Sequence, residues 1–125
     1  MHDAARPFAP AELFSAVLNA LEHADGAVTG VPVDQTLKRV RDERVLETVD
    51  RAALWSVQTP QAFRTEALLK AHESARADGF IGTDDAQLIE RSGGTVMMIR
   101  GTRSNMKLTY PEDFVLAERL AVGPR

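Results

Sequence analysis

Residues 10–33 read PAELFSAVLNALEHADGAVTGVPV, and this stretch decides the fold class. Its first part places apolar residues such as Leu13 and Val17 at a spacing that gathers them on one face of a helix. Its second part is a nearly continuous apolar run, which is typical of a strand buried on both faces of a sheet. The stretch therefore predicts a helix that packs on a sheet and then a buried strand, over residues 10–23 and 27–33.

The rest of the chain continues this alternation of helices and strands. We expect two strands around a charged turn, at residues 36–40 and 45–49. Residues 59–63 then lead into a helix that ends near Ala77, and a short helix capped by Thr83 follows. A buried strand at residues 95–99 and a last helix from Thr109 complete the chain. The pattern predicts an α/β fold with a mostly parallel sheet and one antiparallel excursion, in a single domain over residues 1–125.

The predicted strand pair forms an arm at about residues 34–57. A two-stranded ribbon is marginally stable in water by itself. An arm that projects from a small domain therefore usually leans on another surface, and we expect that surface to belong to a second subunit.

Composition limits the possible functions. The 125 residues contain no cysteine, which excludes disulfides, thiolate metal sites and a cysteine nucleophile. A net charge of −3 argues against general nucleic-acid binding. No apolar run approaches the roughly 20 residues that span a bilayer, and residues 1–6 lack a signal core, so we expect a cytoplasmic protein without membrane contact.

No common catalytic motif is present in the sequence. Glycine-rich phosphate loops are missing, and the 3 histidines are scattered without ligand spacing. Polar residues at the ends of predicted elements remain as candidates, although each also has an ordinary interpretation as a cap or a surface ion-pair member. These candidates are Asp3, Arg6, Thr36, Arg51, Thr59, Thr83 and Lys107.

Ordered segments that contain these candidates resemble the 2-C-methyl-D-erythritol 4-phosphate cytidylyltransferase family. The segments are HDAARPF (residues 2–8), VPVDQTLKR (31–39), VDR with LW (49–51 and 54–55), QTPQAF (58–63), TDDA (83–86) and NMKLT with PED (105–109 and 111–113). The resemblance covers the C-terminal portion of that family, and the family's N-terminal CTP-binding loop has no counterpart here. It implies a Rossmann-like three-layer nucleotidyltransferase domain, N-terminally truncated, with a protruding β-hairpin arm.

The resemblance also implies a reaction. Members of this family transfer CMP from CTP to 2-C-methyl-D-erythritol 4-phosphate with release of pyrophosphate, in the non-mevalonate route to isoprenoids, with Mg²⁺ as cofactor. Phosphoryl transfer of this kind depends on positioning and on cations over the developing charge.

The resemblance assigns a role to each matching position. Arg51 and Lys107 are the catalytic positions that hold the acceptor's phosphate, and the arm arginine comes from the neighbouring subunit of a homodimer. Asp3 faces the metal and the acceptor, and Arg6 supports its turn. The remaining acceptor-binding positions are Thr36, Thr59 and Thr83.

Two alternatives stay open from the sequence. A pentitol-phosphate cytidylyltransferase has a similar fold, although residues 36–39 and 58–61 favour the methylerythritol enzyme. A non-catalytic dimerisation or binding remnant is the second alternative. Because a single preorganised donor can be worth roughly a hundred- to a thousandfold in rate, we expect the chain alone, without the triphosphate loop, to be inactive.

Overall fold

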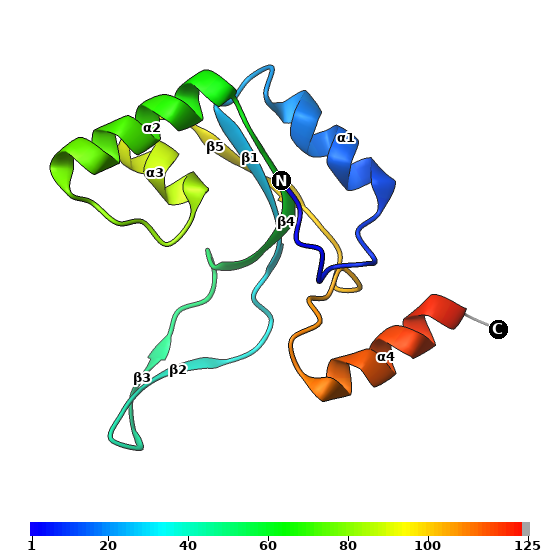
Figure 1. The fold of residues 1–125 in the computed structure, drawn as a ribbon. Helices are drawn as coiled ribbons and strands as arrows, with labels where there is room; N and C mark the ends of the chain where they lie inside the picture. The colour runs from blue at the N-terminus through cyan, green and yellow to red at the C-terminus, as the bar shows by residue number, and fades with distance from the viewer. Residues whose placement is uncertain (124–125) are drawn as a thin grey trace.

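A three-stranded sheet with helices on both faces forms the centre of the molecule (Figure 1). We describe residues 1–123 of the computed structural model. The strand order is β4-β1-β5, with β1 antiparallel to β4 and parallel to β5. The sheet strands are β1 (Gly26–Pro32), β4 (Trp55–Phe63) and β5 (Val96–Arg100), and the helices are α1 (Ala11–Ala20), α2 (Thr65–Asp78), α3 (Asp85–Arg91) and α4 (Pro111–Val122).

The two faces of the sheet carry separate apolar clusters. On one face, Val17 of α1 packs against Ala27 of β1 and Ala62 of β4. On the other, Ala71 of α2 and Ile89 of α3 belong to a second buried cluster. Figure 1 shows α1 on one side of the sheet and α2 with α3 on the opposite side. The predicted three-layer α/β architecture is confirmed.

Strand β4 is the element that the sequence did not reveal. Residues 59–63 were expected to lead directly into a helix, whereas they complete a strand of 9 residues that pairs with β1. The pairing register shifts between Val28 and Thr29, so that Gln61 and Gln58 oppose these consecutive residues. This irregularity, together with the proline at position 60, hides the two-residue alternation that identifies a strand. The expectation of a mostly parallel sheet is therefore wrong for the described residues.

The arm is present and consists of β2 (Leu37–Arg41) and β3 (Arg44–Val49), which pair with each other. It extends away from the sheet in Figure 1, and nearly all of its residues are exposed. The expected boundary at residue 57 lies too far along the chain, because Trp55 already pairs with Pro32 of β1.

Two further expectations about local structure are corrected. Asp84, and not Thr83, caps α3: its carboxylate accepts a hydrogen bond of 2.8 Å from the Gln87 amide. Strand β5 is not buried, because the side chains of Met97 and Met98 are 46% and 37% exposed. The edge of β5 that faces away from β1 has no neighbouring strand within residues 1–123.

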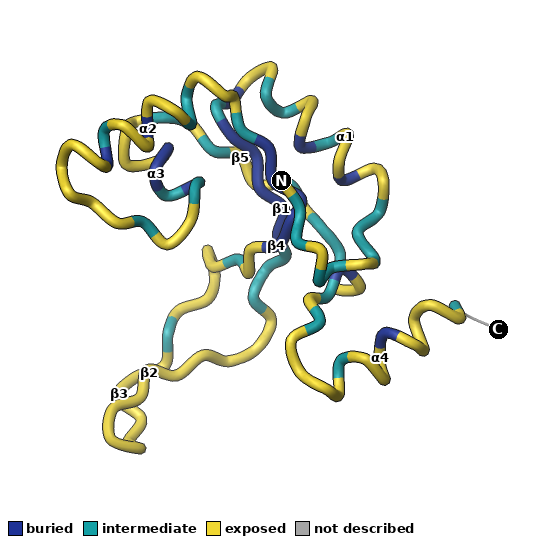
Figure 2. Tube along the Cα trace, in the orientation of Figure 1, coloured by how far each residue is buried: buried dark blue, intermediate teal, exposed yellow. Residues whose placement is uncertain are grey.

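Helix α4 lies apart from the sheet (Figure 1), and Ala117 is its one buried residue (Figure 2). Its start is fixed by Asp113, whose carboxylate accepts hydrogen bonds from the amides of Tyr110 and Thr109 at 2.8 and 2.9 Å. These two bonds favour the charged carboxylate and so hold the pKa of Asp113 below its usual value. The bond from Tyr110 has the larger effect on the pKa, and the bond from Thr109 the smaller. No helix within residues 1–123 is long and apolar enough to cross a bilayer.

Candidate functional site

The candidate site is built around the turn from Asp3 to Arg6. The Arg6 amide donates to the Asp3 carbonyl at 3.1 Å, and the Arg6 guanidinium Nε lies 3.4 Å from the Asp3 carboxylate. The chain before the turn lies along β4, where Met1 and Gln61 exchange two backbone hydrogen bonds. The turn is thereby held against the sheet strand that also carries Thr59.

Thr59 is buried and directly joined to this turn. Its hydroxyl oxygen accepts a hydrogen bond of 2.9 Å from the Asp3 amide and contacts His2 Nδ1 at 2.9 Å. The other ring nitrogen of His2 lies 3.0 Å from the Arg6 carbonyl. Two of the predicted site residues, Asp3 and Thr59, are therefore in contact, and His2 stabilises the same turn.

The loop after β5, residues 101–108, brings Lys107 next to this turn. The amide of Leu108 donates to the Ala5 carbonyl at 2.8 Å, and the Arg6 guanidinium donates to the Asn105 carbonyl at 2.8 Å. The Lys107 side chain is exposed and forms no ion pair with any residue of the described range 1–123. It is thus a free cation on a loop that is fixed next to the Asp3 turn.

The structure does not bring the other candidates into this cluster. Thr36 and Arg51 are exposed at the base of the arm. Thr83 precedes α3, where its amide and hydroxyl contact Gln87 Oε1 at 2.7 and 3.2 Å. Thr83 borders a shallow cavity of about 220 Å³ on the α3 side of the sheet, together with Val57 of β4.

The carboxylate of Asp3 is suited to one metal contact. Its side chain is 42% exposed, and it lines a hollow of about 310 Å³ beside Arg6. Within residues 1–123 no three acidic or histidine side chains gather as a metal-binding group. Mg²⁺ is commonly held by one or two carboxylates together with substrate phosphates and water, and a lone accessible aspartate fits this mode.

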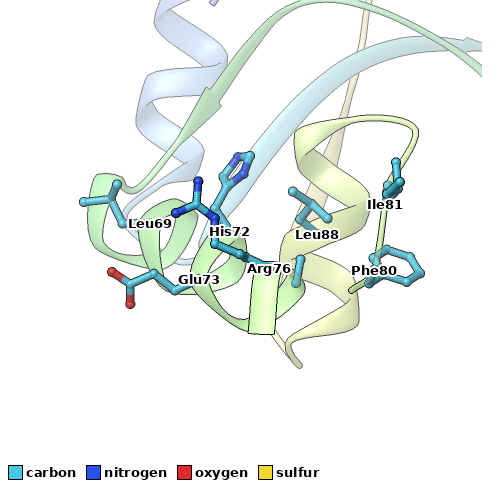
Figure 3. Close-up of a pocket in the computed structure, with 9 residues that line it drawn as sticks. Leu69, His72, Glu73, Arg76, Phe80, Ile81 and Leu88 are labelled. Carbon is cyan, nitrogen blue, oxygen red and sulfur yellow. The ribbon is translucent and has the colours of Figure 1, made fainter. Parts of the chain in front are cut away.

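A second hollow lies elsewhere, between α2, α3 and the loop that joins them (Figure 3). It measures about 430 Å³ and is lined by apolar and charged side chains, including Phe80, Ile81 and Arg76. Beside it, His72 Nε2 lies 3.0 Å from the Asp85 carboxylate. None of the candidate residues lines this hollow, which is therefore separate from the candidate site.

Three residues of the candidate site were missed by sequence reasoning. His2, Gln58 and Asn105 bind the turn, strand β4 and the Lys107 loop to one another. His2 was considered only as a metal ligand or a surface histidine. All three stand inside segments that carry the family resemblance, so their positions within those segments were the available signal.

The layered sheet defines an α/β protein, and its likeness to solved structures shows a nucleotidyltransferase-like fold. The crystal structure of 2-C-methyl-D-erythritol 4-phosphate cytidylyltransferase from Thermus thermophilus is similar with a TM-score of 0.87 and 42% sequence identity, over 97% of this chain and 60% of that chain. The family model IspD: 2-C-methyl-D-erythritol 4-phosphate cytidylyltransferase matches residues 1–122. The chain therefore belongs to the 2-C-methyl-D-erythritol 4-phosphate cytidylyltransferase family, as the motifs predicted.

Curated relatives with the same name agree with this assignment. The protein from Symbiobacterium thermophilum is 50% identical over 121 residues, and the protein from Bacillus licheniformis is 46% identical over 120 residues. Each alignment covers 96% of this chain but 51% and 52% of the respective relatives. The chain thus spans about half the length of the relatives that it matches. Its correspondence to their C-terminal portion stays a prediction.

Proposed function

We propose that this chain supplies the acceptor-binding part of an enzyme that transfers CMP from CTP to 2-C-methyl-D-erythritol 4-phosphate and releases pyrophosphate. The observation that carries the proposal is the convergence of the Asp3–Arg6 turn, Thr59 and the Lys107 loop beside β4. These residues match the segments in which the resemblance places acceptor recognition. A cation free of ion pairs beside a buried polar cluster is suited to binding a phosphate monoester.

In the proposed reaction, a phosphate oxygen of the acceptor attacks the α-phosphorus of CTP. A new P–O bond forms there, the bond from the α-phosphorus to the bridging oxygen of the β-phosphate breaks, and pyrophosphate leaves with that electron pair. Lys107 and Arg51 would hold the attacking phosphate in line, and the resemblance assigns Thr36, Thr59 and Thr83 to the acceptor's hydroxyls. Asp3 would hold Mg²⁺, which supplies charge neutralisation at the phosphates when it is bound.

The proposal includes a homodimer. Arg51 follows the exposed arm, and the arm's two strands pair with each other and not with the three-stranded sheet. An arm that crosses to a second subunit would bury its apolar residues and carry Arg51 to the partner's Lys107 loop. The cytoplasmic location stays a prediction.

The test is pyrophosphate release from CTP and 2-C-methyl-D-erythritol 4-phosphate with Mg²⁺. The assay uses the chain alone and the chain mixed with the N-terminal segment of a family member. We expect release only after mixing, because both phosphate groups must be held at once. Release by the chain alone would show that it needs no further segment. Preference for ribitol phosphate in the mixture would favour the pentitol-phosphate alternative, and the absence of release with any acceptor would favour the non-catalytic one.

A further inference from the structure

Two side-chain amides, those of Gln58 and Asn105, are buried between β4 and the Lys107 loop. Asn105 is 0% exposed and Gln58 is 7% exposed. Asn105 Nδ2 donates to the Thr59 carbonyl at 2.8 Å and to Gln58 Oε1 at 3.3 Å. Gln58 Nε2 in turn donates to the Thr102 carbonyl at 3.0 Å. The amide pair therefore ties both ends of the loop's first turn to the strand that carries Thr59.

Asn105 is also joined to the Asp3–Arg6 turn. Its carbonyl accepts the 2.8 Å hydrogen bond from the Arg6 guanidinium, whose Nε lies 3.4 Å from the Asp3 carboxylate. One buried residue thus contacts the turn through its backbone and β4 through its side chain. Lys107 stands two residues further along the same loop.

Gly101 makes room for this arrangement. A Cβ atom at position 101 would stand 2.5 Å from Gln58 Oε1, which is closer than any non-bonded contact allows. Gln58 is buried and hydrogen-bonded at its amide end, so it cannot move away without losing Thr102 or Asn105. A side chain at position 101 would therefore disturb the hydrogen bonds of Gln58.

Burying these two amides has a desolvation cost that their hydrogen bonds only roughly offset. What the bonds do provide is a fixed geometry, because each ties a defined atom of the loop to a defined atom of β4 or the turn. That geometry fixes the backbone from which Lys107 projects.

We propose that Gln58 and Asn105 are positioning residues that hold Lys107 at a fixed place relative to Thr59 and the Asp3–Arg6 turn. They act on the acceptor's phosphate through Lys107 and do not touch it themselves. The inference rests on the proposed function of Lys107 in binding that phosphate. Small displacements of a phosphate-holding group are costly in reactions of this type, since a shift of about 1 Å can lower the rate roughly a hundredfold.

The first test measures position without any substrate. Asn105→Asp keeps the size and the Oδ1 atom of the residue but places an oxygen against the Thr59 carbonyl. We expect amide hydrogen exchange at Leu108, whose N–H donates to Ala5, to accelerate at least about tenfold relative to amides of β1. Gly101→Ala should act in the same direction. The matched control is Ile89→Val, which alters a residue that is 1% exposed in the α2–α3 cluster and should leave the Leu108 ratio unchanged.

The second test measures turnover in the chain mixed with the N-terminal segment. Asn105→Asp should lower kcat/KM for the acceptor by about ten- to a hundredfold. The double variant Asn105→Asp with Lys107→Ala should have almost the same kcat/KM as Lys107→Ala alone, because both changes remove the same interaction. A change that only destabilises the fold should lower kcat/KM by the same factor with or without Lys107→Ala. Ile89→Val is the control for this case.

The outcomes separate the two proposals. If the parent mixture shows no turnover, the proposed function fails, and the exchange experiment still decides whether the amide pair positions the loop. Unchanged Leu108 exchange in Asn105→Asp would overturn the positioning role. Losses that multiply in the double variant would overturn it as well.

Discussion

Lys107 and Arg51 are expected to hold the same phosphate, yet the structure supports them in opposite ways. Asn105 and Leu108 tie the Lys107 loop to β4 and to the Asp3–Arg6 turn through hydrogen bonds of 2.8 Å. The side-chain amide of Gln58 on β4 also donates to the loop. Arg51 follows an arm whose strands pair with each other and whose residues are nearly all exposed.

Under the proposed function, the two cations therefore differ in how they are supported. A loop fixed by buried hydrogen bonds holds the backbone from which its lysine projects before any ligand binds, which reduces the entropy lost on binding. A two-stranded ribbon alone in water has no such support. In the proposed dimer, Arg51 therefore takes its support from the partner subunit, whereas the Lys107 loop is held within its own chain.

The largest effects should come from removing either cation in the mixture with the N-terminal segment. Lys107→Ala and Arg51→Ala should each lower turnover by about a hundredfold or more without changing the circular dichroism spectrum, because both side chains are exposed. Mixing the two variants should restore about a quarter of the parent activity, since half of the dimers would contain one intact site composed of both subunits.

This mixing experiment can break the comparison. Turnover within a factor of about two of the parent in either single variant would show that its role was assigned wrongly. Loss in both variants without restoration on mixing would place Arg51 in the same site as the Lys107 of its own chain.

The next effect concerns assembly through the arm. Val45 of β3 is 60% exposed, and Val45→Asp should weaken the dimer at least about tenfold, because a charge would be placed in an apolar contact. Leu69→Asp is the matched control, since Leu69 of α2 is 59% exposed but lies outside the arm. Analytical ultracentrifugation measures both. A parent that stays monomeric at high concentration, or equal weakening by both variants, would contradict the role of the arm.

Hydrogen exchange should show a smaller contrast between the two regions. The Leu108 amide is bonded within one chain, so its protection should not depend on protein concentration. Amides of β2 and β3 should exchange rapidly in dilute solution and become at least about tenfold more protected as the dimer forms. Concentration-independent protection of the arm would mean that it is stable by itself.

The smallest effect is expected at the start of α4, beyond the fixed loop. Asp113 has a lowered pKa in the folded chain, so its stabilisation of the first helical turn is present above the pKa of the unfolded chain and is lost as the pH falls through the folded value. The Asp113 carboxyl carbon should titrate in NMR below the usual aspartate value of about 3.9. Asp113→Asn should remove the pH dependence of the Tyr110 amide signal. A midpoint at or above the usual value would contradict the two hydrogen bonds.

Elements with a strong local signal could be predicted from the sequence. The apolar period of α1, the Gly79 end of α2 with its left-handed φ of 67° and the charged turn of the arm are each determined by neighbouring residues. Strand β4 could not be predicted, because the polar residues Gln58 and Gln61 are buried in it by contacts with distant segments.

The same limit applies to the candidate site. The resemblance selected Asp3, Thr59 and Lys107, but nothing in their local sequence showed that Asp3 contacts Thr59 across 56 residues. Asn105 and Gln58 were not selected, since a buried amide and an exposed amide look alike in a sequence. The exposure of Met97 and Met98 was also missed, because an apolar run does not show whether another strand covers it.

The sequence by itself determined the family, the helices, the arm and the α/β class, because these depend on spacing within short segments and on motifs in a fixed order. Only the tertiary structure decided which polar groups meet beside β4 and which cation lies on the loop next to them. The reason is physical: the hydrogen bonds of Asn105 join residues that are 46 and 99 positions apart, and short segments of sequence do not determine which distant residues meet.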